Sequence, residues 1–143
     1  MTFRFNEGEI NLPEGWEDKS VIALSYPAGS KKPDASFAVT KDPAAVGSPS
    51  LAAYVDKQIV DMAKTCPRFE LIRREPGTLD GLAVEQIEFT WRSPEGTSVK
   101  QQQWVVIVGS GVALTFTATV SQARYADYAS VFDGFMRSLT FRR

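Results

Sequence analysis

The sequence predicts an α+β fold, a mostly antiparallel twisted sheet of five to seven strands with two long helices on one face. Apolar and polar residues alternate along several short segments, as in half-buried strands, and turn residues separate these segments. Two other segments repeat apolar residues at helical spacing. The 143 residues have the length of one domain, which we expect to span residues 1–143.

The N-terminal segment predicts short strands and a hairpin. Residues 3–5 alternate in polarity and form a first short strand, and residues 10–12 form a second that the turn residues Pro13-Glu14-Gly15 end. The hairpin that follows has strands at 20–26 and 35–40 and a polar loop at 30–34.

The first helix has clear start and stop signals. Ser48 is the expected N-cap and Pro49 fits the first helical position. The helix should end before Pro67, because the residue preceding a proline is pushed away from helical geometry. Its apolar stripe comprises Leu51, Tyr54, Val55, Ile59 and Met62.

The C-terminal half predicts the rest of the sheet and the second helix. Strands are expected at 69–73, 82–91, 99–108 and 112–119, with turns at 78–81, 93–96 and 109–111. The second helix should begin near Ser121, and Leu139 and Phe141 indicate a short final strand or an extended tail. The apolar side of this helix comprises Tyr125, Tyr128, Val131, Phe132, Phe135 and Met136.

The composition argues against several classes of function. The chain has no histidine, which excludes a Ser-His-Asp triad and a histidine-based zinc site, and no motif indicates a cofactor or a metal. We therefore expect no enzyme. The lone Cys66 is either a buried small apolar residue, which we favour, or a reactive thiol.

Charge and hydropathy favour a protein of the cytoplasm. The net charge of −1 gives no basic field for nucleic acid, so we expect no nucleic-acid partner. No stretch approaches the ~20 apolar residues of a membrane span, so we expect no stable membrane insertion. The first residues contain no secretory apolar region.

One predicted face of the sheet is unusual, because small, β-branched and hydroxylated residues replace the charges of an ordinary solvated face. Such a surface suits an apolar partner that also presents hydrogen-bonding groups. Cover by the chain's own loops or by a second subunit is equally compatible with the pattern. The residues of this face are Val21, Ala23, Ser25, Ser36, Ala38, Thr40, Gln101, Gln103, Val105, Ile107, Ala113, Thr115, Thr117 and Thr119.

Gln58 lies on or beside the apolar stripe of the first helix, seven residues after Leu51 and four before Met62. A buried amide must find hydrogen-bond partners. A structural bond to a neighbouring backbone group is the interpretation we favour, and a bond across the sheet edge to a ligand is the alternative.

The chain resembles the DcrB-like proteins and, more narrowly, the Eag adaptor chaperones of type VI secretion. The segments that carry the resemblance are residues 5–20 (FNEGEINLPEGWEDKS), the strand at 20–26, residues 35–42 (ASFAVTKD), the helix around Tyr54-Val55 and Gln58, and Gln101-Gln102-Gln103 with the Thr-rich strand that follows. The resemblance spans nearly the whole chain.

The resemblance implies a PsbP-like α+β fold, a homodimer and no catalysis. Eag chaperones hold the N-terminal transmembrane helices of a toxic effector, often an Rhs or PAAR-containing protein, in the cytoplasm of a Gram-negative bacterium before export. Ala23 stands where a larger aliphatic residue is common in the family, and Thr40 where Ser is common. The choice of Gln103 as the residue that faces the client rests on the strand register, and Gln102 is the alternative. The implied partner-binding residues are Val21, Ala23, Ser36, Thr40, Gln58 and Gln103, and Ala38 joins them from the same predicted face.

Two other functions compete with this expectation. A small-molecule or lipid-binding module could use the same open face. A stand-alone structural relative of the DcrB lipoproteins is the second, although the sequence shows no lipoprotein signal.

Overall fold

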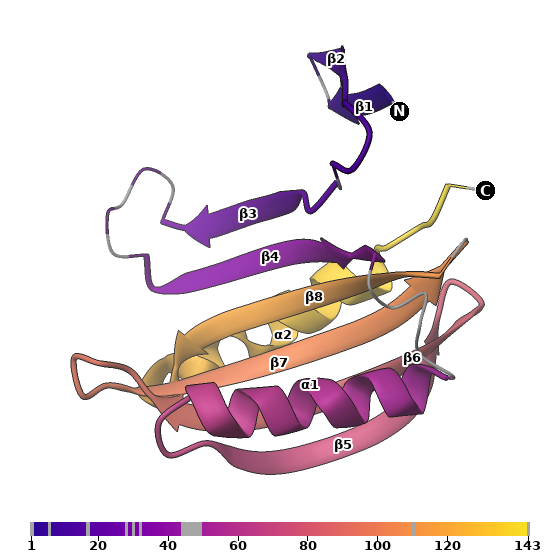
Figure 1. Ribbon diagram of the computed structural model, residues 1–143. Helices are drawn as coiled ribbons and strands as arrows, with labels where there is room; N and C mark the ends of the chain where they lie inside the picture. Colours follow the sequence, from indigo (N-terminus) through magenta and orange to yellow (C-terminus); the bar gives the residue numbers. More distant parts are fainter. Residues whose placement is uncertain are drawn as a thin grey trace.

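The computed structural model of the chain is shown in Figure 1 and describes residues 2–5, 7–16, 18–27, 29, 31, 33–43, 50–109 and 111–142. A six-stranded antiparallel sheet has the order β3-β4-β8-β7-β6-β5, and β1 and β2 form a separate two-stranded sheet. The strands are β1 (Thr2–Phe5), β2 (Gly8–Asn11), β3 (Val21–Tyr26), β4 (Ala35–Asp42), β5 (Glu70–Leu79), β6 (Leu82–Arg92), β7 (Ser98–Val108) and β8 (Val112–Ser121). The helices are α1 (Leu51–Thr65) and α2 (Tyr125–Arg137), and a 3₁₀ turn, η2 (Gln122–Arg124), precedes α2.

The predicted fold class is confirmed, but the two helices lie on opposite faces of the sheet rather than on one (Figure 1). Val55 of α1 belongs to a cluster with Val105 of β7, whereas Phe132 of α2 belongs to a cluster with Trp104 and Val106. Successive side chains of a strand point to opposite faces. The central strands are therefore apolar on both faces, and one helix packs against each face.

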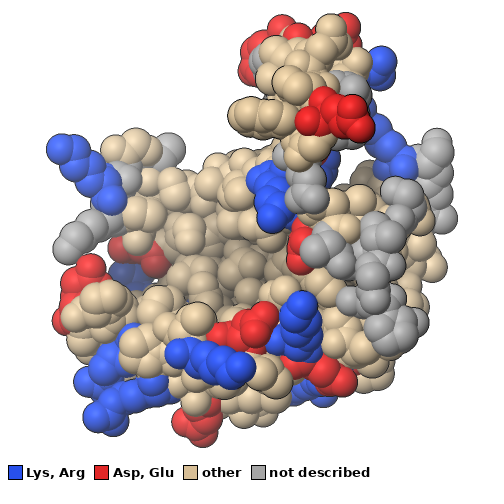
Figure 2. Space-filling model, viewed as in Figure 1, with Lys and Arg blue, Asp and Glu red and all other residues tan. Residues whose placement is uncertain are grey.

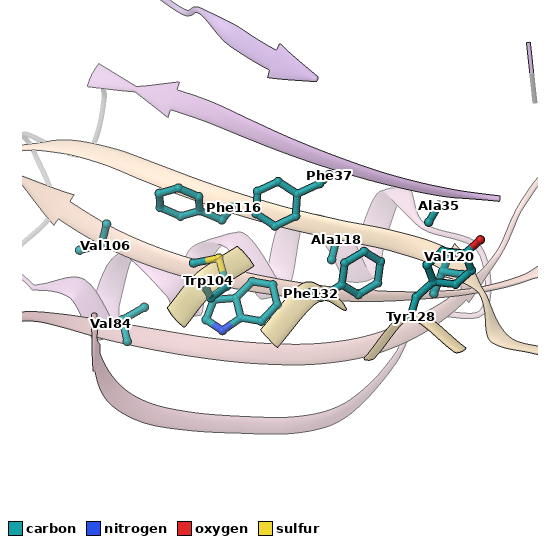
Figure 3. Close-up of a cluster of buried hydrophobic side chains, with 11 residues drawn as sticks. Ala35, Phe37, Val84, Trp104, Val106, Phe116, Ala118, Val120, Tyr128 and Phe132 are labelled. Atoms are coloured by element: carbon teal, nitrogen blue, oxygen red, sulfur yellow. The ribbon is translucent and has the colours of Figure 1, made fainter. Parts of the chain in front are cut away.

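The cluster on the α2 side is the larger of the two. Figure 3 shows Trp104 of the sheet beside Phe132 of α2, and Phe116 beside Phe37 of β4. The cluster on the α1 side is smaller and includes the fully buried Val55. Because α1 covers mainly β6 and β7, β3 and β4 lie beyond it on this face (Figure 1).

Local signals explain most of the element bounds. The N-cap of α1 is Ser50, whose Oγ accepts a hydrogen bond from the Ala53 amide at 3.1 Å. The N-cap predicted from the sequence, Ser48, lies two residues before the actual one. Ser48 and Pro49 are outside the described residues. The helix ends at Thr65, and Cys66 has the extended geometry expected before a proline. Cys66 is partly exposed, so its predicted burial was wrong.

Two other boundaries differ from the prediction. α2 begins at Tyr125 because a 3₁₀ turn occupies residues 122–124. β5 continues to Leu79 through Pro76, which an edge strand tolerates because one side of it needs no ladder hydrogen bonds. The turn to β6 places Asp80 and Gly81 at φ 46° and 82°, as a tight hairpin turn requires.

Candidate functional site: a groove between α1 and β3

Four neighbouring strands form a polar but uncharged surface beside α1, which we call the groove floor. Strand pairing places Ala23 opposite Ala38 and Ala38 opposite Thr117, which itself lies opposite Gln103. Directly opposed residues in antiparallel strands share a face, so these side chains lie in one row across the sheet. Parallel rows are formed by Val21, Thr40, Thr115 and Val105, and by Ser25, Ser36, Thr119 and Gln101.

The groove floor is accessible because α1 stops short of it. Ala38, Thr117 and Gln103 are half-buried, and Ala23 on the edge strand is exposed. Figure 2 shows an uncharged recess between α1 and β3, with charged side chains along its rim. The recess lies on the face that the sequence predicts to be open and to carry small and hydroxylated residues. Because α1 covers part of this face, the open area is smaller than predicted.

The wall of the groove is the flank of α1 that carries Tyr54 and Gln58. The Tyr54 hydroxyl donates a hydrogen bond to a carboxylate oxygen of Asp42 at 2.7 Å, and Gln58 Nε2 donates to the Tyr54 hydroxyl oxygen at 3.2 Å. Since Asp42 ends β4, this chain ties the wall to the floor. Burial, together with the hydrogen bond to Asp42, raises the pKa of Tyr54 above its usual range, so the hydroxyl keeps its proton.

The hydrogen bond from Nε2 fixes how Gln58 presents its amide. The amide nitrogen is engaged with Tyr54, and a primary amide retains an acceptor on its oxygen. The bond is structural, as favoured from the sequence, but the partner is the side chain of Tyr54 and not a backbone group. The partly buried Gln58 still offers a polar group to whatever occupies the groove.

The two glutamines of the groove floor differ in their bonding. Gln101 Nε2 donates to Thr119 Oγ1 at 2.8 Å, and Gln101 Oε1 accepts from the Trp91 indole at 3.1 Å. Gln103 Oε1 is buried, and among the described residues it has no hydrogen-bond partner. A buried acceptor without a partner costs about 1–3 kcal/mol. Gln102 Oε1 is also buried and has no hydrogen-bond partner among the described residues, but Gln102 lies on the α2 face.

One end of the groove is polar. A cavity of about 470 Å³ lies where Ser36 and Thr119 meet two loops, and its lining includes Lys31, Asp34 and Glu95. The charged residues absent from the groove floor are thus found at its end.

The structure brings the sequence-predicted residues together. Gln58 lies on the wall, and the other six share the groove floor: Val21, Ala23, Ser36, Ala38, Thr40 and Gln103. Asp42 and the polar role of Tyr54 were not predicted from the sequence, which indicated only that Tyr54 belongs to the apolar stripe. The four-residue spacing of Tyr54 and Gln58 was the available signal.

Within the described ranges, no three Cys, Asp or Glu side chains gather in a way that could hold a metal ion. In the same part of the chain, no helix has the length and apolar character needed to cross a membrane.

Comparisons with known proteins give a consistent result. The family model described as DcrB matches residues 7–138. The curated protein Effector EagT6 of Pseudomonas aeruginosa is 27% identical over 140 residues, which cover 98% of this chain and 95% of that protein.

Three solved structures resemble the fold. Protein PA94 of Pseudomonas aeruginosa, described as a protein of unknown function and putative regulator, matches with a TM-score of 0.83 at 25% identity, covering 100% of this chain and 97% of that one. LpqN of Mycobacterium tuberculosis, described as involved in cell envelope biogenesis, matches with a TM-score of 0.61 at 13% identity over 85% and 84% of the chains. PsbP of the cyanobacterium Synechocystis matches with a TM-score of 0.53 at 18% identity over 87% and 81%, which confirms the predicted PsbP-like fold.

Proposed function

Since the chain belongs to the DcrB family, we propose that it is a cytoplasmic chaperone and adaptor for one effector of type VI secretion. In this proposal the groove shields the N-terminal transmembrane helices of a toxic effector of the Rhs or PAAR-containing type until export. The relative named Effector EagT6 supports the link to an effector. The chaperone needs no catalytic group, cofactor or ATP.

The observation that carries the proposal is the chemistry of the groove floor. Transmembrane helices pack through small residues that allow close approach, and their polar side chains form hydrogen bonds between helices. Ala23 and Ala38 give the floor its low profile, and Thr117 and Gln103 supply hydrogen-bonding groups beside them. A floor of this kind substitutes for a neighbouring helix of a membrane protein.

The dimensions of the groove suit one helix. β3, β4 and β8 provide a free width of about 14 Å at a strand spacing of about 4.8 Å, against a helix diameter of about 10 Å. The eight residues of β4 extend for about 26 Å, the length of a helix of about 17 residues. A single chain therefore has room for most of one membrane-spanning helix.

The proposal includes a homodimer, which the family resemblance implies. A small-molecule or lipid ligand on the same face remains the second candidate. Native mass spectrometry of the purified protein separates the two functions, because a lipid-binding module should retain a ligand of a few hundred daltons while a chaperone purified without its client should not.

The experiment that tests the proposal compares a double arginine variant of the groove, at Gln58 and Gln103, with a control arginine substitution on α1. Gln58→Arg changes the wall of the groove, whereas Val60→Arg changes a residue of the same helix that is 51% exposed and lies on another flank. We expect the tagged wild type and Val60→Arg to capture an effector through its apolar N-terminal helices. Gln58→Arg combined with Gln103→Arg should lower that capture at least tenfold while thermal unfolding still shows a folded protein.

Two outcomes would contradict the proposal. Full capture by the folded double variant would show that the client binds elsewhere. Equal capture of an effector whose N-terminal helices have been deleted would show that those helices are not what the protein recognises.

A further inference from the structure

The face of the sheet that carries α2, opposite the groove, has two unlike halves. The helix packs against β8, and β3 lies beyond it at the edge of the sheet (Figure 1). On the β5 side this face is charged, because Glu88 pairs with Arg73 at 3.3 Å and with Lys100 at 2.6 Å. On the β3 side large apolar side chains are exposed. They form what we call the α2 patch: Ile22, Leu24, Tyr26, Val131 and Phe135.

The α2 patch surrounds a cavity between the helix and the edge of the sheet. Strand pairing sets Leu24 opposite Phe37, whose ring centroid lies 5.3 Å from that of Phe135. The cavity at this position has a volume of about 510 Å³, in the range of sites that bind a ligand. The five residues of the patch are 42–64% exposed. They expose on the order of 500 Å², the size of the largest patches on monomeric proteins, which are often functional.

One end of the cavity is acidic and aromatic. At the start of α2, Arg124 Nε donates to a carboxylate oxygen of Asp127 at 2.8 Å, and Arg124 Nη1 lies 3.7 Å from Asp34. Two carboxylates face one guanidinium, so these three side chains retain a surplus negative charge. The rings of Tyr26 and Tyr128 lie 6.3 Å apart, and the Tyr128 hydroxyl donates to Asp34 at 3.2 Å. Carboxylates beside aromatic rings favour a cation at this end.

The uncovered half of this face has the dimensions of one further helix. β3 and β4 provide about 10 Å beside α2 at a strand spacing of about 4.8 Å, and neighbouring helices pack about 8–10 Å apart. The 13 residues of α2 extend for about 20 Å. A helix of about the same length therefore fits beside α2, with the side chains of its lower face in the cavity.

We propose that the α2 patch binds an amphipathic helix of a second protein, antiparallel to α2 and with a Lys or Arg in its last turn. Apolar residues at positions i, i+3, i+4 and i+7 of this helix occupy the cavity. The antiparallel direction places the C-terminus of the helix at the acidic end, where the helix dipole also favours a basic residue.

The chemistry of this occupant differs from that of a transmembrane client. The outer side of a helix on the α2 patch faces water, so the helix must be polar on that side. The site is also separate from the groove, because successive side chains of β3 point to opposite faces of the sheet. A second protein can thus bind while the groove is occupied, and its binding does not depend on the client.

The test uses a designed peptide of about 14 residues. It has leucines along one face of the helix, two lysines in the last turn, and alanine and glutamine elsewhere. The interface buries on the order of 1,000 Å² in total, which is typical of weak and transient complexes. We therefore expect a micromolar dissociation constant from the fluorescence anisotropy of the labelled peptide, measured without any effector. No binding at 1 mM protein would overturn the proposal.

Two matched valine substitutions locate the peptide. Val131 of α2 is 44% exposed and Val60 of α1 is 51% exposed. We expect Val131→Arg to weaken peptide binding at least tenfold, and Val60→Arg to leave it unchanged. The groove variant Gln58→Arg with Gln103→Arg should also bind the peptide as the wild type does. A folded Val131→Arg protein with full affinity would overturn the proposal. Loss of binding in the groove variant would overturn it as well, and neither result would touch the proposed function.

The acidic end has a test of its own. Replacing both lysines of the peptide by glutamine should weaken its binding to the wild type about three- to tenfold, as expected for exposed ion pairs. The same replacement should have no effect on the variant Asp34→Asn with Asp127→Asn. Equal affinity of the two peptides for the wild type would overturn the proposed basic last turn and the direction of the helix.

Discussion

Replacing Tyr54 by phenylalanine tests the link between the wall of the groove and its floor. The substitution removes only the hydroxyl, which donates to Asp42 at 2.7 Å and accepts from Gln58 at 3.2 Å. The ring stays where it packs, because Tyr54 is only 5% exposed and belongs to the core cluster on the α1 side. The change therefore isolates two hydrogen bonds.

The expected cost follows from these bonds. A hydrogen bond to a charged acceptor contributes about 1.5–3 kcal/mol, and the longer bond from Gln58 contributes about 0.5–1 kcal/mol. We expect Tyr54→Phe to lower the free energy of unfolding by about 2–3 kcal/mol, which for a chain of this size lowers the melting temperature by about 6–10 °C. Because Gln58 loses its hydrogen bond to Tyr54, the substitution should also weaken client binding by about three- to tenfold.

The pH dependence gives a second, independent signature. The pKa of Tyr54 is raised in the folded protein, so its contribution is fully present below the unfolded pKa of about 10 and is lost as pH rises above it. Above pH 10 this side chain should lower the wild-type free energy of unfolding by about 1.4 kcal/mol per pH unit. The difference between wild type and Tyr54→Phe should therefore shrink between pH 7 and pH 11.

The assay is urea unfolding of wild type, Tyr54→Phe, Asp42→Asn and the double variant at both pH values. The double-mutant cycle removes contributions that Asp42 makes to other groups. A coupling energy of about 1.5–2 kcal/mol at pH 7 is expected. A coupling below about 0.3 kcal/mol, with the same pH dependence in all four proteins, would refute the reasoning.

Three further substitutions test how α1 is held. Ser50→Ala removes the N-cap bond to Ala53 and should lower the free energy of unfolding in urea by about 1 kcal/mol. An unchanged free energy of unfolding would show that Ser50 is not the cap. Val55→Ala opens a cavity at a fully buried position and should cost about 2–3 kcal/mol, so a cost under 1 kcal/mol would contradict its place in the core. Arg74 bonds Glu85 at 2.7 Å and Asp56 at 2.5 Å, which raises the pKa of its guanidinium and ties α1 to the sheet. Arg74→Met should cost about 1–2 kcal/mol and increase hydrogen exchange in α1, whereas unchanged exchange would show that the ion pairs do not hold the helix.

The strand pattern could be predicted from the sequence because alternation and turn residues are local signals. The Asp80-Gly81 turn and the helix stop before Pro67 are examples in which a single residue decides the geometry. The placement of the helices could not be predicted in this way. Val105 and Trp104 make both faces of β7 apolar, and only tertiary packing assigns one helix to each face.

The residue types of the candidate site could be predicted from the sequence, but the contacts between its strands and its helix could not. Alternation placed Ala38 among the small residues of its strand, and the family resemblance supplied Gln103. Strand pairing places the two residues in one row through Thr117. The bond between Tyr54 and Asp42 joins residues on different elements, so no periodicity reveals it.

The central claim is that the groove floor contacts the apolar helices of a client. Site-specific photo-crosslinking from Thr117, in the middle of the floor, tests it most directly when the protein is expressed with its effector. The matched position is Val131 on α2, which is 44% exposed on the opposite face. The account predicts that a probe at Thr117 links to an apolar N-terminal helix of the effector and that a probe at Val131 does not. Links to that helix from Val131 alone would contradict it.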